Sequence, residues 1–502
     1  MIRKRQLLIN AVASGLQVVV TAGTLFVLYR FVKDSIGIEN FGIWSLVLAT
    51  TSVSSLANLG MAASVVKFVS MYLARGCPDR ASAIVQTGVI TLAVVLAIAL
   101  VMLYPVVARI LEEPLESDQV PLALSILPYA FVSFWITSIA GVLQGSVDGH
   151  QRVDLRSACL TGAALSYLAA VFVLVPERGL IGLAQAQVIQ AGLLLIAVWF
   201  VAYRLMPELP LLPIVWRWDV FKEILSYSVQ FQVVSVFQLL TEPITKYLVM
   251  AFGGAALAGY FEFAYRMVVQ LRTLVVTTHR SIVPTIADLQ ERAAEVVRDL
   301  YRTSFRLILY LILGGLPLLI ALSPWISEVW LGSYEAAFVT FAVVLFVGWF
   351  LNMLSNPAYF AYLGIGNLRW VVTGHAVIGI LNVTLGIILG RLFGAFGVVG
   401  GFTAALLVGS LVTTIAYQRA YRIRFSEVIR RESTALGLTA VAGMVLALFL
   451  YDMIKPTLHP LLIAILVAGS YLAVTATPLW LHPVRRQVHG WFARYLFGSK
   501  DT

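Results

Sequence analysis

The sequence predicts an all-α, polytopic membrane protein of about fourteen transmembrane helices, arranged as two pseudo-symmetric six-helix lobes plus two extra helices. Of its 502 residues, 60% are apolar and only 12% are charged, whereas soluble proteins average roughly 45 to 50% apolar and about 25% charged. Apolar windows of about 18 residues or more, the length that crosses a bilayer as a helix, recur along the whole chain. The positions of these windows also repeat between the two halves of the sequence.

The expected spans follow one another with connections too short to hold a soluble domain. The basic residues that open the chain resemble the start of a signal peptide, but the apolar stretch after them is too long and has no clear cleavage site, so we expect it to remain as the first span. The spans are residues 8–31, 41–66, 82–109, 120–147, 154–175, 180–203, 222–250, 256–283, 303–323, 336–362, 371–390, 396–418, 434–453 and 459–480.

An internal repeat relates the two halves by a shift of 217 residues, which is 254 minus 37. The matched residues are Gly37 and Gly254, Gly42 and Gly259, Gly149 and Gly366, and Arg152 and Arg369. Because six spans is an even number, the halves have the same topology, which predicts a pseudo-two-fold axis along the membrane normal with a cavity between the halves. The expected division is an N-lobe at 1–205, a C-lobe at 206–425, and the last two helices with an amphipathic tail at 426–502.

The charge distribution predicts that both termini face the cytosol. Most of the 35 Lys and Arg fall in or beside connections that are cytosolic in this topology, as the positive-inside rule requires. The net charge of +10 is therefore explained by topology, and no nucleic-acid partner is expected. A helical extension is expected at 285–306 below the membrane, and an in-plane amphipathic helix at 484–497.

No enzyme, cofactor or metal site is predicted. Cys77 and Cys159 have neither metal-ligand nor CxxC spacing. Gly364 and Gly366 lack the third glycine of a dinucleotide loop, and the sequence contains no Walker motif. The outer loops are too short to carry the catalytic groups of a membrane glycosyltransferase or polymerase, so that class is disfavoured.

Polar residues at helical spacing mark two repeat-related spans. In the first span they are Asn10, Ser14, Gln17, Thr21 and Thr24, with Arg30 near the outer end. In the seventh they are Ser228, Gln232, Ser235, Gln238, Glu242 and Lys246, and the eighth adds Glu262 and Arg266 on one stripe. Stripes of this kind predict two helix faces that line a central cleft.

The charged residues on these stripes are the best candidates for a site, because a charge at the bilayer centre costs on the order of 3 kcal/mol unless it faces protein or water. Arg30, Lys246 and Arg266, with Gln17 and Gln238, are predicted to bind substrate in the central cavity. Glu242 and Glu262 are predicted to serve in coupling or in ion pairs. Two alternatives stay open: the neutral polar residues can act as hydrogen-bonding contacts between helices, and the charged ones can form a structural salt bridge.

Over essentially its whole length, the chain resembles the lipid-linked oligosaccharide flippases and polysaccharide exporters of the multidrug/oligosaccharidyl-lipid/polysaccharide (MOP) exporter superfamily. The segments that carry the resemblance are Glu39-Asn40-Phe41-Gly42-Ile43-Trp44, Leu56-Ala57-Asn58-Leu59-Gly60-Met61, Gly141-Val142-Leu143-Gln144-Gly145, Gly149-His150-Gln151-Arg152 and Ala258-Gly259-Tyr260-Phe261-Glu262-Phe263-Ala264-Tyr265-Arg266. Asn58 stands where the family has an acidic residue, so a role for that acid does not transfer.

The resemblance implies two lobes with a central cavity that opens alternately to the two sides of the bacterial cytoplasmic membrane. It implies outward flipping of an undecaprenyl-diphosphate-linked oligosaccharide for surface polysaccharide assembly, with membrane lipids, a polysaccharide polymerase and assembly proteins as partners. The positive residues of the predicted cavity agree with a diphosphate substrate. A peptidoglycan-precursor flippase and a cation-coupled multidrug antiporter remain alternatives, and Glu242 and Glu262 favour the second.

Overall fold

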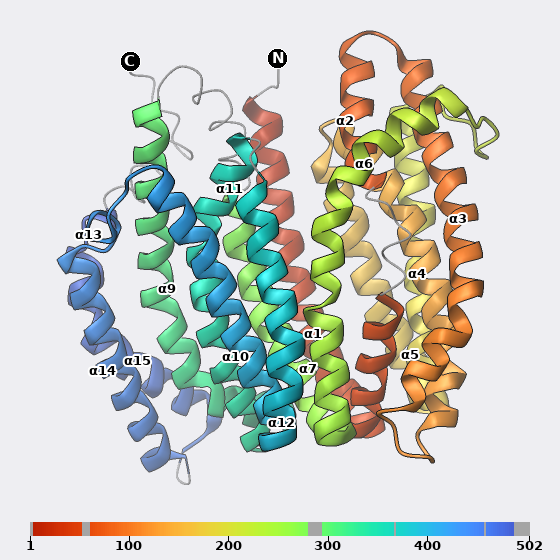
Figure 1. The fold of residues 1–502 in the computed structure, drawn as a ribbon. Helices are drawn as coiled ribbons and strands as arrows, with labels where there is room; N and C mark the ends of the chain where they lie inside the picture. Colours follow the sequence, from red (N-terminus) through yellow and green to blue (C-terminus); the bar gives the residue numbers. More distant parts are fainter. Residues whose placement is uncertain (1–3, 53–60, 280–293, 366–367, 456–457, 486–502) are drawn as a thin grey trace. The chain divides into compact units, whose positions relative to one another are not determined.

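The computed structural model describes residues 4–52, 61–279, 294–365, 368–455 and 458–485. Throughout these residues the regular structure is helical (Figure 1). The helices are α1 (Lys4–Thr51), α2 (Met61–Ala74), α3 (Pro78–Glu112), α4 (Val120–Gly149), α5 (Val153–Leu205), α6 (Trp218–Leu239), α7 (Glu242–His279), α9 (Ala294–Leu331), α10 (Ala336–Leu354), α11 (Asn356–Ile365), α12 (Arg369–Ala420), α13 (Phe425–Val428), α14 (Arg431–Ile454) and α15 (Pro460–Leu481). The all-α prediction is confirmed.

Ten helical stretches within the described residues are long and apolar enough to cross a membrane. Four of them are broken inside by a glycine with positive φ, at Gly37, Gly179, Gly254 and Gly394. Each broken stretch is therefore made of two helical segments, and the all-helical, multi-pass fold predicted from the sequence is confirmed with ten candidate spans among the described residues. The chain is a multi-pass membrane protein.

The breaks in α5 and α12 are chain reversals. A straight helix of 53 residues, the length of α5, would extend about 80 Å, far more than the roughly 30 Å of hydrocarbon in a bilayer. A β-carbon at Gly182 would overlap the carbonyl oxygen of Leu174, and one at Gly397 would overlap that of Leu389. Residues eight apart in one continuous helix would be separated by about 12 Å, so each helix doubles back into two antiparallel spans.

Two expected spans are interrupted. The seventh, expected at 222–250, is divided between α6 and α7, and the tenth, expected at 336–362, between α10 and α11. Pro243 and Pro357 each lie in the first turn of the helix that follows the break. Proline lacks an N–H and is favoured at that position, so it ends one helix and starts the next.

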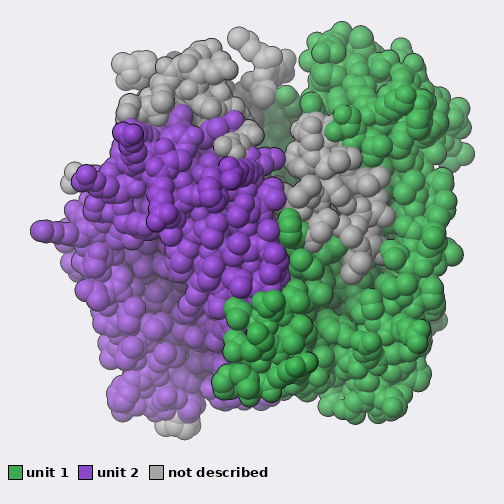
Figure 2. Space-filling view, in the orientation of Figure 1, with its two compact units in different colours: residues 1–262, 383–398 green, residues 263–382, 399–502 purple. Residues whose placement is uncertain are grey.

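The chain groups into two compact units, which Figure 2 shows in different colours. Unit 1 comprises residues 1–262 and 383–398, and in it α5 packs against α4 and α1. Unit 2 comprises residues 263–382 and 399–502, and in it α14 and α15 pack on each other and on α9 around the buried Tyr451 and Tyr471. The division into lobes at 205 and 425 stays a prediction.

Two expected peripheral segments fall largely on residues that the structure does not describe. The cytosolic extension expected at 285–306 is described only from Ala294, where α9 begins. The amphipathic tail expected at 484–497 lies outside the described residues except for its first two.

Candidate functional site

The candidate site lies in unit 1, where α1 bends at Gly37 and α7 bends at Gly254. These glycines have φ of 82° and 76° with extended ψ, a conformation that residues with a β-carbon rarely adopt. They are 217 residues apart, so the repeat predicted from the sequence is confirmed in the backbone at this point. We call the two bent segments the α1 elbow and the α7 elbow.

The two elbows contact each other reciprocally. A β-carbon at Gly42 would overlap the carbonyl oxygen of Ala255, and a β-carbon at Gly259 would overlap the carbonyl oxygen of Ile38. The 217-residue shift carries Gly42 onto Gly259 and Ile38 onto Ala255, so each contact is the repeat image of the other. Such reciprocity is the mark of a two-fold interface, and it places a local pseudo-two-fold axis between the elbows.

A buried ionic cluster lies beside these contacts. Lys246 Nζ is 2.7 Å from Glu262 Oε2 and 2.8 Å from Glu242 Oε1. The Ser45 hydroxyl donates to Glu262 Oε2 at 2.8 Å, and the Tyr29 hydroxyl donates to Glu262 Oε1 at 3.4 Å. Lys246 and Glu262 are buried, whereas 36% of the Glu242 side chain is exposed. We call these five residues the Lys246 cluster.

The cluster has the symmetry of the elbows. The shift carries Tyr29 onto Lys246 and Ser45 onto Glu262, and each of these four residues is eight positions from its elbow glycine, about 12 Å along the helix. Ser45 and Glu262 are thus repeat-related residues in direct contact, 217 positions apart, which requires both to lie beside the axis. One half of the repeat supplies two neutral hydroxyls, and the other supplies an ion pair.

Electrostatics explains why these groups occur together. Glu262 could not remain ionised in an apolar interior alone, but it receives one ammonium and two hydroxyl contacts, and hydrogen bonds to a charged group are the stronger kind. Lys246 in turn is shared between two carboxylates. If all three ionise, the cluster has a net charge of −1, so protonation of one carboxylate would leave a neutral pair.

The structure brings together three of the predicted site residues: Glu242, Lys246 and Glu262. The salt-bridge alternative is therefore realised by Lys246 with both carboxylates. Arg30 lies on the same helix as Tyr29 but is exposed, with Nε 3.8 Å from Asp34.

The remaining predicted site residues are Gln17, Arg266 and Gln238. Gln17 is half-buried on α1, and Arg266 is half-buried on α7 in unit 2. Gln238 lies outside the described side chains. A cavity role for these residues stays a prediction.

The polar stripe of α1 begins with contacts between helices. Asn10 donates to the Gln151 carbonyl at 2.9 Å and accepts from the Asp154 N–H at 3.1 Å, and Ser14 lies 3.5 Å from the Ser157 hydroxyl. For Asn10 and Ser14, the hydrogen-bonding alternative left open by the sequence is therefore realised at the start of α5.

Tyr29 and Ser45 were missed as site residues because neither is charged. The repeat itself contained the signal, since the 217-residue shift places them on Lys246 and Glu262. No group of three or more His, Cys, Asp or Glu able to hold a metal ion occurs among the residues whose placement is described.

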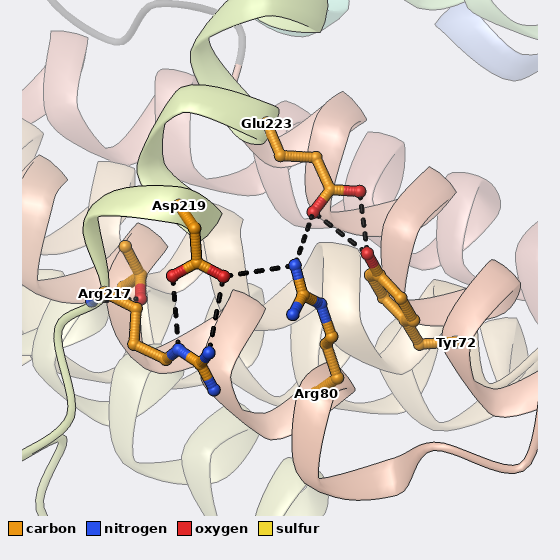
Figure 3. Close-up of polar contacts among 6 residues, drawn as sticks. Tyr72, Arg80, Arg217, Asp219 and Glu223 are labelled. Carbon is orange, nitrogen blue, oxygen red and sulfur yellow. Dashed lines mark hydrogen bonds and ion pairs between the residues drawn. The ribbon is translucent and has the colours of Figure 1, made fainter.

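A second ionic cluster in unit 1 joins α2 and α3 to α6 (Figure 3). Arg80 lies 3.2 Å from Asp219 and 3.6 Å from Glu223, and Tyr72 donates to Glu223 at 2.8 Å. Arg217 pairs with Asp219 at 3.3 Å. Burial and the Glu223 carboxylate raise the pKa of Tyr72, so it stays a neutral donor. We call this group the Arg80 cluster.

The connection that precedes α6 is held on α3 by side-chain bonds. Gln86 Oε1 accepts from the N–H groups of Ile214 and Val215, each at 3.1 Å, and Thr91 accepts from the Trp216 indole at 3.0 Å. The two Gln86 bonds satisfy backbone donors of a segment that has no secondary structure of its own, and the Thr91 bond satisfies the indole donor.

Comparison with known proteins gives a family and a fold. The family described as "Polysaccharide biosynthesis protein" matches residues 6–290 of this chain. No curated protein matches this chain. Among solved structures, the inward-facing conformation of a multidrug resistance MATE family transporter of the MOP superfamily is 13% identical, with a TM-score of 0.71 over 81% of this chain and 98% of that one.

Two further solved structures have the same fold. The lipid II flippase MurJ in an inward closed conformation is 14% identical, with a TM-score of 0.67 over 93% of this chain and 98% of its own. A MOP superfamily transporter from Pyrococcus furiosus is 13% identical, with a TM-score of 0.57 over 85% and 95%. At these identities the likeness concerns the fold, and the fold implied by the sequence resemblance is confirmed.

Proposed function

Because this chain belongs to the polysaccharide biosynthesis protein family, we propose that it is a flippase that moves an undecaprenyl-diphosphate-linked oligosaccharide across the bacterial cytoplasmic membrane, and not an enzyme. The observation that supports this function is Lys246, a buried ammonium held between two carboxylates where the repeat-related elbows meet. A diphosphate needs a cationic group in a region of low dielectric constant, and a lysine that can exchange partners supplies one.

The proposed mechanism is alternating access, with the elbows as the contact that closes one side. In the sequence-predicted topology, the elbows lie at the outer ends of their helices, so their packing closes the outer side. The backbones approach so closely at Gly42 and Gly259 that outward opening has to separate them. Separation also breaks the Ser45 and Tyr29 bonds to Glu262, since α1 supplies both hydroxyls.

Proton binding drives the exchange of Lys246 from its carboxylate partners to the substrate. Glu242 is the half-exposed carboxylate of the cluster and is the first that a proton can reach. Neutralising Glu242 and then Glu262 weakens the two ion pairs described for Lys246 and makes its charge available to the substrate diphosphate. Delivery of the sugar to the outer surface would supply a polymerase and assembly proteins, which are the partners in this proposal.

A cation-coupled multidrug antiporter is the second candidate, and a specific observation favours it. With all groups ionised, the Lys246 cluster contains two carboxylates and one ammonium, so its net negative charge suits an organic cation. A peptidoglycan-precursor flippase would use the same lipid diphosphate chemistry as the first proposal and differs only in the sugar.

Lipid analysis of a deletion strain separates these candidates. The proposal expects an undecaprenyl-diphosphate-linked oligosaccharide to accumulate and the surface polysaccharide to be lost. Accumulation of the peptidoglycan precursor would change the substrate. Unchanged lipid intermediates with raised sensitivity to cationic drugs would overturn the flippase and support the antiporter.

Complementation of the deletion strain tests the residues. Lys246→Met and Arg266→Gln are expected to insert into the membrane and fail to restore polysaccharide, even when expression is raised to compensate for the lower stability of Lys246→Met. Lys222→Met is the matched control, because Lys222 lies on α6 outside the cluster, 5.3 Å from the Trp218 ring centroid, and should restore it fully. Full activity of a stable Lys246→Met/Arg266→Gln variant would remove both residues from the site.

A further inference from the structure

A groove at the carboxyl end of α12, in unit 2, combines an apolar wall with a basic end. Its apolar part is a cavity of about 730 Å³ between Trp370 at the start of α12 and the last turns of the same helix. Its basic part is a second cavity of about 570 Å³ next to Phe425. The two cavities share Ile415 and Arg419, so they adjoin each other, and we call them together the groove.

Three arginines gather at the basic end: Arg419, Arg422 and Arg424. All three side chains are exposed. The apolar part is lined by residues that include Val408 and Leu411, which are also exposed. The groove therefore offers positive charge at the membrane surface and hydrocarbon contacts beneath it.

The backbone at Arg422 is a second sign that the charge there has a use. Arg422 has φ of 52° just beyond the helix end, a position where the chain turns left-handed and where glycine is the usual residue. The Ile423 N–H closes the turn on the Gln418 carbonyl at 2.8 Å. An arginine in this conformation accepts backbone strain that glycine would avoid.

The repeat shows that topology alone does not require these arginines. The breaks at Gly179 and Gly394 are 215 residues apart, and the same shift carries the last residue of α5 onto the last residue of α12. It also carries Arg204 onto Arg419. The positions equivalent to Arg422 and Arg424 are Pro207 and Leu209, so the first half keeps one arginine where the second half has three.

From these observations we propose that the groove binds one anionic phospholipid of the leaflet that the sequence predicts to be cytosolic. Its phosphate would lie among Arg419, Arg422 and Arg424, and an acyl chain would lie along Trp370, Val408 and Leu411. Basic pockets of membrane proteins on the cytosolic side recognise anionic head groups in this way, and each arginine contributes about fivefold in affinity. This site shares no residue with the Lys246 cluster, and the proposal does not depend on the proposed transport function.

The test uses the full-length protein purified in detergent, with lipid binding counted by native mass spectrometry. Phosphatidylglycerol is titrated against phosphatidylcholine with the same acyl chains. We expect one saturable site that prefers phosphatidylglycerol, and a loss of about 25-fold in that preference for Arg422→Gln/Arg424→Gln, from two arginines at about fivefold each. Arg422→Lys/Arg424→Lys should keep most of the affinity for phosphatidylglycerol. That result would show that the glutamine variant loses its preference through lost charge and not through misfolding.

Arg204→Gln is the matched control, since Arg204 ends the repeat-related helix without the other two arginines. It should bind as the unaltered protein does. The proposal is overturned if phosphatidylcholine binds equally well, if the double glutamine variant keeps full preference, or if Arg204→Gln loses as much. Displacement of phosphatidylglycerol by a small molar fraction of undecaprenyl diphosphate would also overturn it, because the groove would then hold a substrate-type lipid.

Discussion

Replacing Lys246 with methionine removes the ammonium that neutralises the Lys246 cluster while keeping a side chain of similar length. Opposite charges separated by the 2.7 Å found between Lys246 and Glu262 attract by about 6 kcal/mol at an effective dielectric constant of 20. Much of that attraction offsets the cost of removing both charges from water. Breaking a buried pair from one side leaves the other charge uncompensated and typically costs about 3–5 kcal/mol.

We therefore expect Lys246→Met to lower the free energy of unfolding by about 3–5 kcal/mol. Glu262→Gln should cost less, about 1–3 kcal/mol, because Lys246 keeps Glu242 at 2.8 Å and the new amide oxygen can still accept from Ser45. In the double variant no charge is left uncompensated at Glu262, so it should be at least about 2 kcal/mol more stable than Lys246→Met alone.

The assay is equilibrium unfolding in mixed micelles with increasing dodecyl sulfate, followed by circular dichroism and arranged as a double-mutant cycle. Lys222→Met is the control and should change stability by less than about 0.5 kcal/mol. If the two single effects add within about 0.5 kcal/mol, Lys246 and Glu262 do not interact, and the description of the cluster as one ionic unit is refuted.

Three more predictions follow from other contacts. Gly42→Ala should prevent the elbows from packing, because its β-carbon would overlap a backbone oxygen, whereas Gly23→Ala on the same helix meets open space and should be neutral. Cysteine cross-linking between the elbows measures both variants, and equal cross-linking would contradict the close contact at Gly42. Backbone N–H bonding and the Arg302 guanidinium lower the pKa of Glu427. The attachment of α13 to α9 is therefore retained above the ordinary glutamate pKa of about 4.3 and lost as pH falls through the lower folded value. Protection of α13 against hydrogen exchange should fall only in acid, and unchanged protection would refute the pairing. Arg80→Gln should cost at most about 1 kcal/mol, because the Arg80 cluster is partly exposed; a larger loss in the same unfolding assay would show that the cluster is more than a surface contact.

The sequence predicted the features that depend on periodicity. Apolar windows predicted the spans, and the match of Gly37 with Gly254 predicted a shared feature that proves to be a backbone break. Charge inside apolar windows singled out Lys246 and Glu262, because such charges need nearby partners in a membrane.

What the sequence missed depends on how distant segments meet. Tyr29 and Ser45 are ordinary span residues until the elbows pack, when the local axis brings both hydroxyls to Glu262. The Arg80 cluster was missed because the segment before α6 has no periodicity, and Asp219 and Glu223 come to lie beside Arg80 when this segment attaches to α3 and α6 packs on α2 and α3.

The most direct test of the proposed function is transport in reconstituted vesicles. The purified chain is inserted into proteoliposomes that contain an undecaprenyl-diphosphate-linked oligosaccharide, and an impermeant lectin or glycosidase reports how much sugar reaches the opposite leaflet. The proposal predicts movement that depends on the protein, is lost in Lys246→Met and is kept in Lys222→Met. If the sugar stays on its original leaflet with folded protein, or moves equally well in Lys246→Met, the assigned function or its site is wrong.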